Sequence, residues 1–150
     1  MTKSLFQPAD NAEIVRRIRL VRADAKPRWG KMDAAQMMAH LQQAFRVATG
    51  ELVLQRVLIG HLFGWIAKKQ LTNDKPFGRN LPTDKTFIIR DVRDFARERD
   101  RLEGLVQAFG AKGPACLTQE AHPFFGRLTI EEWDCLMWKH SDHHLRQFGA

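Results

Sequence analysis

Apolar residues recur every three or four positions along four stretches of this chain, with polar residues between them. This period predicts amphipathic helices over residues 11–23, 33–49, 91–109 and 129–148. Three of these helices are expected to begin at a capping box, in which a short polar residue precedes Glu or Gln by three positions: Asp10 with Glu13, Asp33 with Gln36, and Thr129 with Glu132. Gly50 and Gly110 follow two of the stretches and are expected to end those helices.

A fifth stretch, residues 52–67, is apolar on nearly every side and predicts a buried helix. It is shorter than the ~20 apolar residues that span a bilayer and is interrupted by polar side chains, so we expect no membrane segment. Gly60 and Gly64 lie about one helical turn apart, a spacing that lets a neighbouring helix approach closely.

Two long segments, residues 71–89 and 110–128, lack a regular period and contain turn-prone Pro and Gly. With the five helical stretches, they predict an all-α protein, a four-helix bundle with an additional short helix and long crossover loops. The length suits a single domain over residues 1–150. We expect the two loops to lie near one another at the open end of the bundle, since loops on a rigid scaffold commonly carry function.

Two histidines continue the apolar face of the last predicted helix. His140 and His144 follow Trp133 and Met137 on one side of that helix and lie one turn apart. This is the spacing of two ligands that a single helix gives to one metal ion. Such a pair also occurs on solvated helix faces, and it is the apolar surroundings that favour a metal site. His143 leaves the helix roughly 80° from this face and is not expected to be an equal partner.

The sequence offers two candidates for a third metal ligand. His40 borders the apolar face of the second predicted helix, and His61 lies within the apolar stretch of residues 52–67. Each could instead be an ordinary packing residue at the edge of the core. His40 is the better placed, but spacing alone leaves both open.

The chain carries a formal net charge of +7, which would admit nucleic acid as a partner. The charges, however, are scattered. One group of arginines gathers on the first predicted helix, another alternates with acidic residues on a later one, and no nucleic-acid motif accompanies them, so we expect solvated helix faces instead. Cys116 and Cys135 form no redox or metal-binding motif, and no secretory signal is present. These features predict a cytoplasmic protein, and a homodimer is compatible with them.

Several motifs together resemble a known family. They are WGKM at residues 29–32, MMAH at 37–40, HPFFG at 122–126, EW at 132–133 and KHSDHHLRQFG at 139–149. The combination is similar to the DinB/YfiT-like metalloenzymes, in particular to a subgroup of unknown function with the HPFFG and HHLRQFG motifs. This resemblance covers nearly the whole chain. It implies an up-down-down-up bundle whose divalent metal, nickel or zinc, is held by His40, His140 and His144, and it thereby selects His40 over His61.

Three imidazoles leave coordination positions of a metal open, so we expect a metal-dependent enzyme that acts on a small-molecule substrate. The resemblance admits a hydrolase or a thiol-dependent transferase and selects neither. His122, in the HPFFG segment, is a candidate proton carrier or support for the ligands, and the alternative is that it caps local backbone. A non-catalytic metal-binding or stress-related binding module is the main rival, and a basic nucleic-acid-binding protein is a less favoured one.

Overall fold

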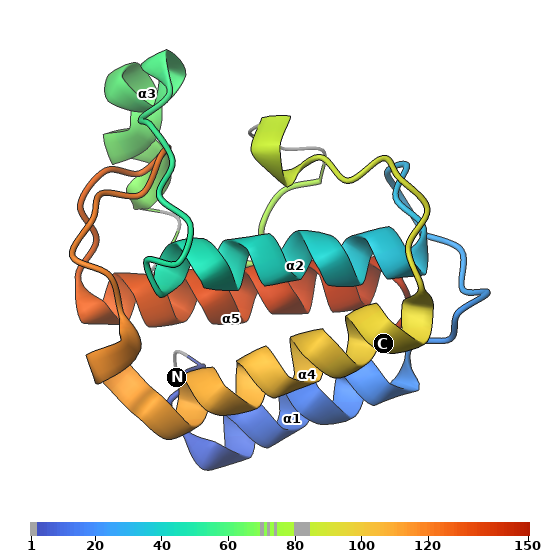
Figure 1. Cartoon of the computed structure of the whole chain (residues 1–150). Helices are drawn as coiled ribbons and strands as arrows, with labels where there is room; N and C mark the ends of the chain where they lie inside the picture. Colours follow the sequence, from blue (N-terminus) through green and yellow to red (C-terminus); the bar gives the residue numbers. More distant parts are fainter. Residues whose placement is uncertain (1–2, 70, 72, 74, 80–84) are drawn as a thin grey trace.

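The computed structural model of the chain describes residues 3–69, 71, 73, 75–79 and 85–150, with the backbone alone at residues 59, 61, 63 and 86. This part is helical, as predicted, and contains no strand beyond one isolated antiparallel bridge. The α-helices are α1 (Pro8–Leu20), α2 (Ala34–Ala48), α3 (Leu58–Lys68), α4 (Phe95–Lys112) and α5 (Ile130–Gln147), and two short 3₁₀ helices are η1 (Lys85–Phe87) and η2 (Gly113–Cys116) (Figure 1).

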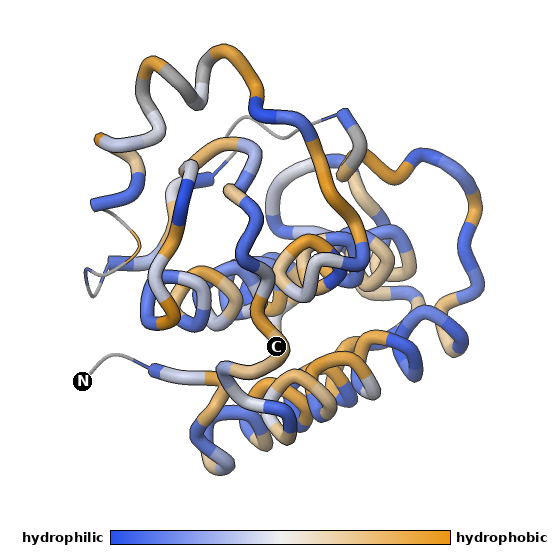
Figure 2. The backbone as a smooth tube through the Cα atoms, turned by 60° about the vertical axis from the view of Figure 1, so that its left-hand side comes forward, coloured by the Kyte–Doolittle hydropathy of each residue, from blue (hydrophilic) through white to orange (hydrophobic). Residues whose placement is uncertain are grey.

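Four helices enclose one core. Helices α4 and α5 each lie against both α1 and α2, while α3 stands apart from them (Figure 1). Hydrophobic and hydrophilic residues alternate along the helices, so each helix turns one face inward (Figure 2). The rings of Phe45 on α2 and Phe109 on α4 meet edge to face, with centroids 5.3 Å apart, at the centre of this core. Each such buried side chain stabilises the fold by about 1.5–3 kcal/mol.

Two of the three predicted capping boxes are confirmed. Asp33 and Thr129 cap α2 and α5, and each box has both of its reciprocal hydrogen bonds. The box predicted at Asp10 is wrong. Helix α1 already begins at Pro8, because proline is pre-organised for the first helical position, and the Asp10 carboxylate accepts instead from the Ser4 backbone N–H.

Several predicted bounds also shift. Helix α1 ends three residues before the predicted residue 23, and α4 begins four residues after the predicted residue 91, where Asp94 caps it. Gly110 does not end α4, which continues to Lys112. The residue that follows, Gly113, has a φ of +60° and stops it there.

Helix α3 differs from its prediction in length and in exposure. It begins at Leu58 instead of residue 52, and it is not a buried helix. Four of its apolar side chains are exposed to solvent: Leu58, Leu62, Trp65 and Ile66. Apolar content alone cannot distinguish a helix covered on all sides from one that packs on one side only. None of the helices in the described residues is both long and apolar enough to cross a membrane.

The covered side of α3 rests on the HPFFG loop, residues 122–126. A Cβ atom added to Gly60 would lie 2.6 Å from the Phe124 carbonyl oxygen, and one added to Gly64 would meet the same oxygen. The backbone N–H of Val57 donates to the Pro123 carbonyl at 3.0 Å. The two glycines therefore do permit a close approach, but the partner is loop backbone and not a second helix.

Candidate metal centre

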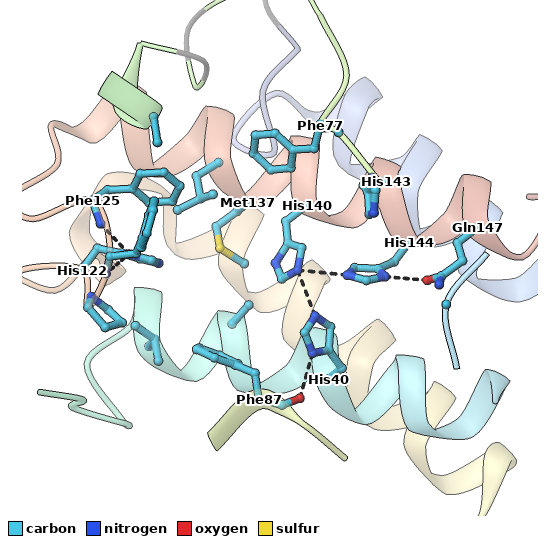
Figure 3. Close-up of a pocket in the computed structure, with 18 of the residues that line it drawn as sticks. His40, Phe77, Phe87, His122, Phe125, Met137, His140, His143, His144 and Gln147 are labelled. Carbon is cyan, nitrogen blue, oxygen red and sulfur yellow. Dashed lines mark hydrogen bonds between the residues drawn. The ribbon is translucent and has the colours of Figure 1, made fainter. Parts of the chain in front are cut away.

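Three histidines from two facing helices converge on one point. His40 comes from the middle of α2, and His140 and His144 come from successive turns of α5 (Figure 3). The Nε2 atom of His140 lies 3.0 Å from Nε2 of His40 and 3.1 Å from Nε2 of His144. The potential ligand atoms of the three rings all lie within 4.8 Å of one another. The structure therefore brings together the three residues that the sequence and the resemblance proposed as ligands.

In two of the three rings, the hydrogen bond made by Nδ1 determines which ring nitrogen carries the proton. His40 Nδ1 lies 2.9 Å from the Phe87 carbonyl oxygen, so it must be the N–H donor of that ring. His144 Nδ1 lies 2.8 Å from Oε1 of Gln147, whose amide nitrogen donates to the Trp29 carbonyl. Because that contact sets the orientation of the amide, His144 Nδ1 is also a donor. His40 and His144 therefore both present an Nε2 lone pair.

These two lone pairs face the same atom, Nε2 of His140. If His140 Nε2 carries a proton, it can donate a hydrogen bond to only one of these two lone pairs. The other lone pair would then have no hydrogen-bond donor. A cation among the three nitrogens would satisfy all of them. Zn–N bonds of 2.0–2.1 Å at angles between 90° and 109° separate ligand nitrogens by about 2.9–3.3 Å. Two of the three separations, 3.0 and 3.1 Å, fall in this range, and all three ligand atoms lie within 4.8 Å of one another, so the side chains are placed to hold a divalent metal.

Burial keeps all three rings neutral. Desolvation lowers the pKa of His40 and holds the pKa of His140 well below its ordinary value, where the other two rings of the cluster oppose its protonation further. The pKa of His144 falls to about 3, mainly through burial. Neutral imidazole is the form that binds metal, so the cluster is ready to ligate at neutral pH.

The remaining candidates lie outside the converging set, although the His143 ring meets the His144 ring edge to face, with centroids 5.0 Å apart. The His143 ring is half-buried against Trp29, with the ring centroids 5.4 Å apart, and does not belong to the set of converging nitrogens. The Asp142 carboxylate also turns away from this set, because it pairs with Arg17 of α1 at 2.7 Å and with Arg146. The side chain of His61 lies outside the described part of the structure, so only the resemblance and the convergence of the other three rings favour His40.

The cluster opens into a pocket of about 550 Å³. Its wall is formed mainly by aromatic and aliphatic side chains, including Phe77, Phe87, Phe125, Trp133, Leu136 and Met137. Both predicted loops contribute to the lining of this pocket, one through Phe77 and the other through the HPFFG loop. None of the described residues that line this pocket is an Asp or a Glu.

His122 lies in the wall of the same pocket and is locked by its own loop. Its Nδ1 accepts hydrogen bonds from the backbone N–H groups of Phe124 and Phe125, at 3.1 and 3.2 Å. Its backbone pairs in both directions with Gly126, at 2.8 and 3.0 Å. Burial lowers the pKa of the ring to about 4, so it is neutral at physiological pH. The local capping that the sequence allowed for this residue is thus present.

Two contributors to the site were not found from the sequence. Gln147 orients His144, and the Phe87 carbonyl orients His40. Gln147 had a detectable signal, because it lies three residues after His144 and thus on the same helical face. The Phe87 carbonyl had none. Gly30, with a φ of +80°, leaves room for Gln147, since a Cβ there would lie 2.6 Å from its amide nitrogen.

Comparison with known proteins gives one match. No curated protein and no solved structure is significantly similar to the chain. Residues 2–150 match the profile of a family described as a protein of unknown function, DUF1569. Because this match extends over almost the entire sequence, the chain belongs to the DUF1569 family.

Proposed function

We propose that this protein is a DinB-like, divalent-metal-dependent enzyme that acts on a small molecule in the pocket beside the three-histidine cluster. The metal, nickel or zinc, is held by His40, His140 and His144. The observation that carries the proposal is the convergence of two fixed Nε2 lone pairs on a third Nε2 atom, at 3.0 and 3.1 Å. Neutral side chains alone leave this arrangement unsatisfied, and a cation stabilises it.

The course of the helices supports the DinB-like part of the proposal. In Figure 1, α1 and α5 run from left to right, while α2 and α4 run from right to left. This is the order of directions in an up-down-down-up bundle, with α3 as an additional helix in the connection between α2 and α4. One ligand on α2 and an i, i+4 pair on α5 agree with the ligand pattern that the resemblance implies.

The residues around the cluster suit a reaction on a bound small molecule. His40, His140 and His144 would hold a divalent ion with coordination positions left open, and the ion would supply Lewis-acid chemistry toward an oxygen or sulfur atom of a ligand. The Phe87 carbonyl and Gln147 hold the rings of His40 and His144 in place. The wall of the pocket is mainly aromatic and aliphatic, so polar interactions made beside it are stronger than in bulk water.

Among the two reaction classes, the pocket favours thiol-dependent transfer. Metal-dependent hydrolases of the HExxH type use a carboxylate as general base, and the described residues of this wall include no carboxylate. A thiol ionises much more readily than water, so a thiol substrate would depend less on such a base. Hydrolysis is the second candidate reaction class for an enzyme with this site.

Ion pairing of the arginines supports a small-molecule partner over nucleic acid. On α1 the guanidinium groups of Arg16 and Arg19 pair with Glu13 and Glu103. On α4 the Arg99 side chain pairs with the neighbouring Asp100. Cations paired in this way do not form the unopposed positive surface that tracks a phosphate backbone.

A thiol-consumption assay tests this function. Metal-loaded wild-type protein is incubated with cysteine and 1-chloro-2,4-dinitrobenzene, and the remaining thiol is measured colorimetrically beside the released chloride. We expect consumption above the uncatalysed rate, lost in His140→Ala. Equal rates with wild-type protein, His140→Ala and buffer, repeated over a panel of aromatic electrophiles, would favour the non-catalytic metal-binding module instead.

A further inference from the structure

His122 contributes one more polar group to the pocket, its second ring nitrogen. Because Nδ1 accepts from two backbone N–H groups, it must carry a lone pair, and the proton of the neutral ring resides on Nε2. Nε2 has no hydrogen-bond partner among the described residues, and the ring is partly buried in the pocket wall. This N–H donor faces a mainly apolar pocket, where an acceptor on a bound ligand can satisfy it.

The ring cannot turn away from the pocket. Its backbone is fixed by the pair of hydrogen bonds with Gly126, and its faces pack against Phe125 and Trp133, with centroids 4.8 and 5.5 Å away. Figure 3 shows the second nitrogen of His122 turned into the pocket, with Met137 between His122 and the three-histidine cluster. The pocket therefore has polar groups at two separated places and apolar side chains between them.

The charges of the wall restrict the ligand further. The described lining residues include no carboxylate, so a cationic ligand would lose its hydration without gaining an ionic partner. Lys31, the one charged side chain among them, is exposed to solvent. A neutral molecule pays the least to enter such an apolar space.

We propose that Nε2–H of His122 is a specificity-determining hydrogen-bond donor, and that the pocket binds a neutral, mostly aromatic molecule with a carbonyl-type oxygen placed to accept from it. This inference rests on the proposed function in that both use the same pocket, but it does not require the metal. His122 holds its proton in the neutral state near pH 7, so it binds and orients the ligand and does not exchange protons with it.

Two probes of the same shape isolate this hydrogen bond. Acetophenone and 2-phenylpropene differ only in a carbonyl oxygen in place of a methylene group. The variant His122→Asn keeps an acceptor at the position of Nδ1 for the two loop N–H groups, but its side chain is too short to place a donor at Nε2. We expect His122→Asn to weaken acetophenone binding about ten-fold and to leave 2-phenylpropene binding unchanged. Binding is followed by the side-chain ¹⁵N resonances of the histidines in the protein as purified.

The same NMR experiment reports the tautomer. We expect His122 to be protonated on Nε2 alone at pH 7 and its Nε2–H resonance to shift with acetophenone. A proton on Nδ1, equal loss of both probes in His122→Asn, or no binding of either probe to the wild type would overturn the inference. Metal content is measured on the same samples. Absent metal together with selective acetophenone binding would refute the proposed metal function and leave the role of His122 intact.

Discussion

Gln147 is the side chain whose removal should most directly show how the cluster is held. It is almost fully buried, accepts from Nδ1–H of His144 at 2.8 Å and donates to the Trp29 carbonyl. The substitution Gln147→Met keeps the length of the side chain and removes both hydrogen bonds. His144 can then rotate or place its proton on Nε2, where it no longer ligates. Loss of a group that orients a metal ligand typically weakens affinity by 10- to 100-fold, or about 1.4–2.7 kcal/mol.

The assay is a zinc titration against a chromophoric chelator at pH 7.5. Gln107→Met is the matched control, because Gln107 is exposed on α4 and the chemical change is the same. Leaving the His144 donor and the Trp29 carbonyl unsatisfied should also lower the free energy of unfolding by about 1–3 kcal/mol, measured separately in urea. Unchanged zinc affinity in Gln147→Met, or an equal loss in Gln107→Met, would refute the orienting role.

Two further predictions concern stability. The folded-state pKa of His122 is about 4 against an ordinary 6.5, so this ring stabilises the fold fully above pH 6.5, and the contribution is lost as pH falls toward 4. We expect this ring to account for roughly 3 kcal/mol of the free energy of unfolding that the protein loses on acidification, as measured in urea. In His122→Asn the free energy of unfolding should depend on pH less steeply by that amount, and parallel pH curves for variant and wild type would contradict this. Gly64→Ala should destabilise by about 1–3 kcal/mol because its methyl group would meet the carbonyl of the HPFFG loop. Gly104 lies in the middle of α4 with open space around it, so Gly104→Ala should instead stabilise the protein by about 0.5–1 kcal/mol. If both variants shifted the melting temperature in the same direction, the packing of α3 on the HPFFG loop would be contradicted.

The helices and their caps could be predicted because their signals are local. Asp33 and Thr129 lie next to the residues that they cap, and the helical period of α2 and α5 is visible in a short window. Local signals misled where two of them competed. Pro8 and Asp10 both mark a helix start, and the structure uses the proline, which lies first in the chain.

The exposure of α3 and the choice of ligands depended on contacts between distant residues. Gly60 and Gly64 predicted a close approach to another segment. That segment is a loop about 60 residues further along the chain, so the sequence could not show which face of α3 would be exposed to solvent. His40 and His140 are 100 residues apart, and no spacing rule joins them. The residue pattern made His40 the better placed of two candidates, and only the family resemblance selected it over His61. The Phe87 carbonyl, which fixes the His40 tautomer, has no sequence signal at all.

Metal content of protein purified without an affinity tag tests the central claim most directly. Wild-type protein and the single variants His40→Ala, His140→Ala, His144→Ala and His143→Ala are compared by elemental analysis at neutral pH. We predict close to one equivalent of nickel or zinc in the wild type and in His143→Ala, and a sharp loss in each of the other three variants, because their nitrogens form the converging set. Retained metal in His140→Ala or His144→Ala, or an equal loss in His143→Ala, would contradict the assignment.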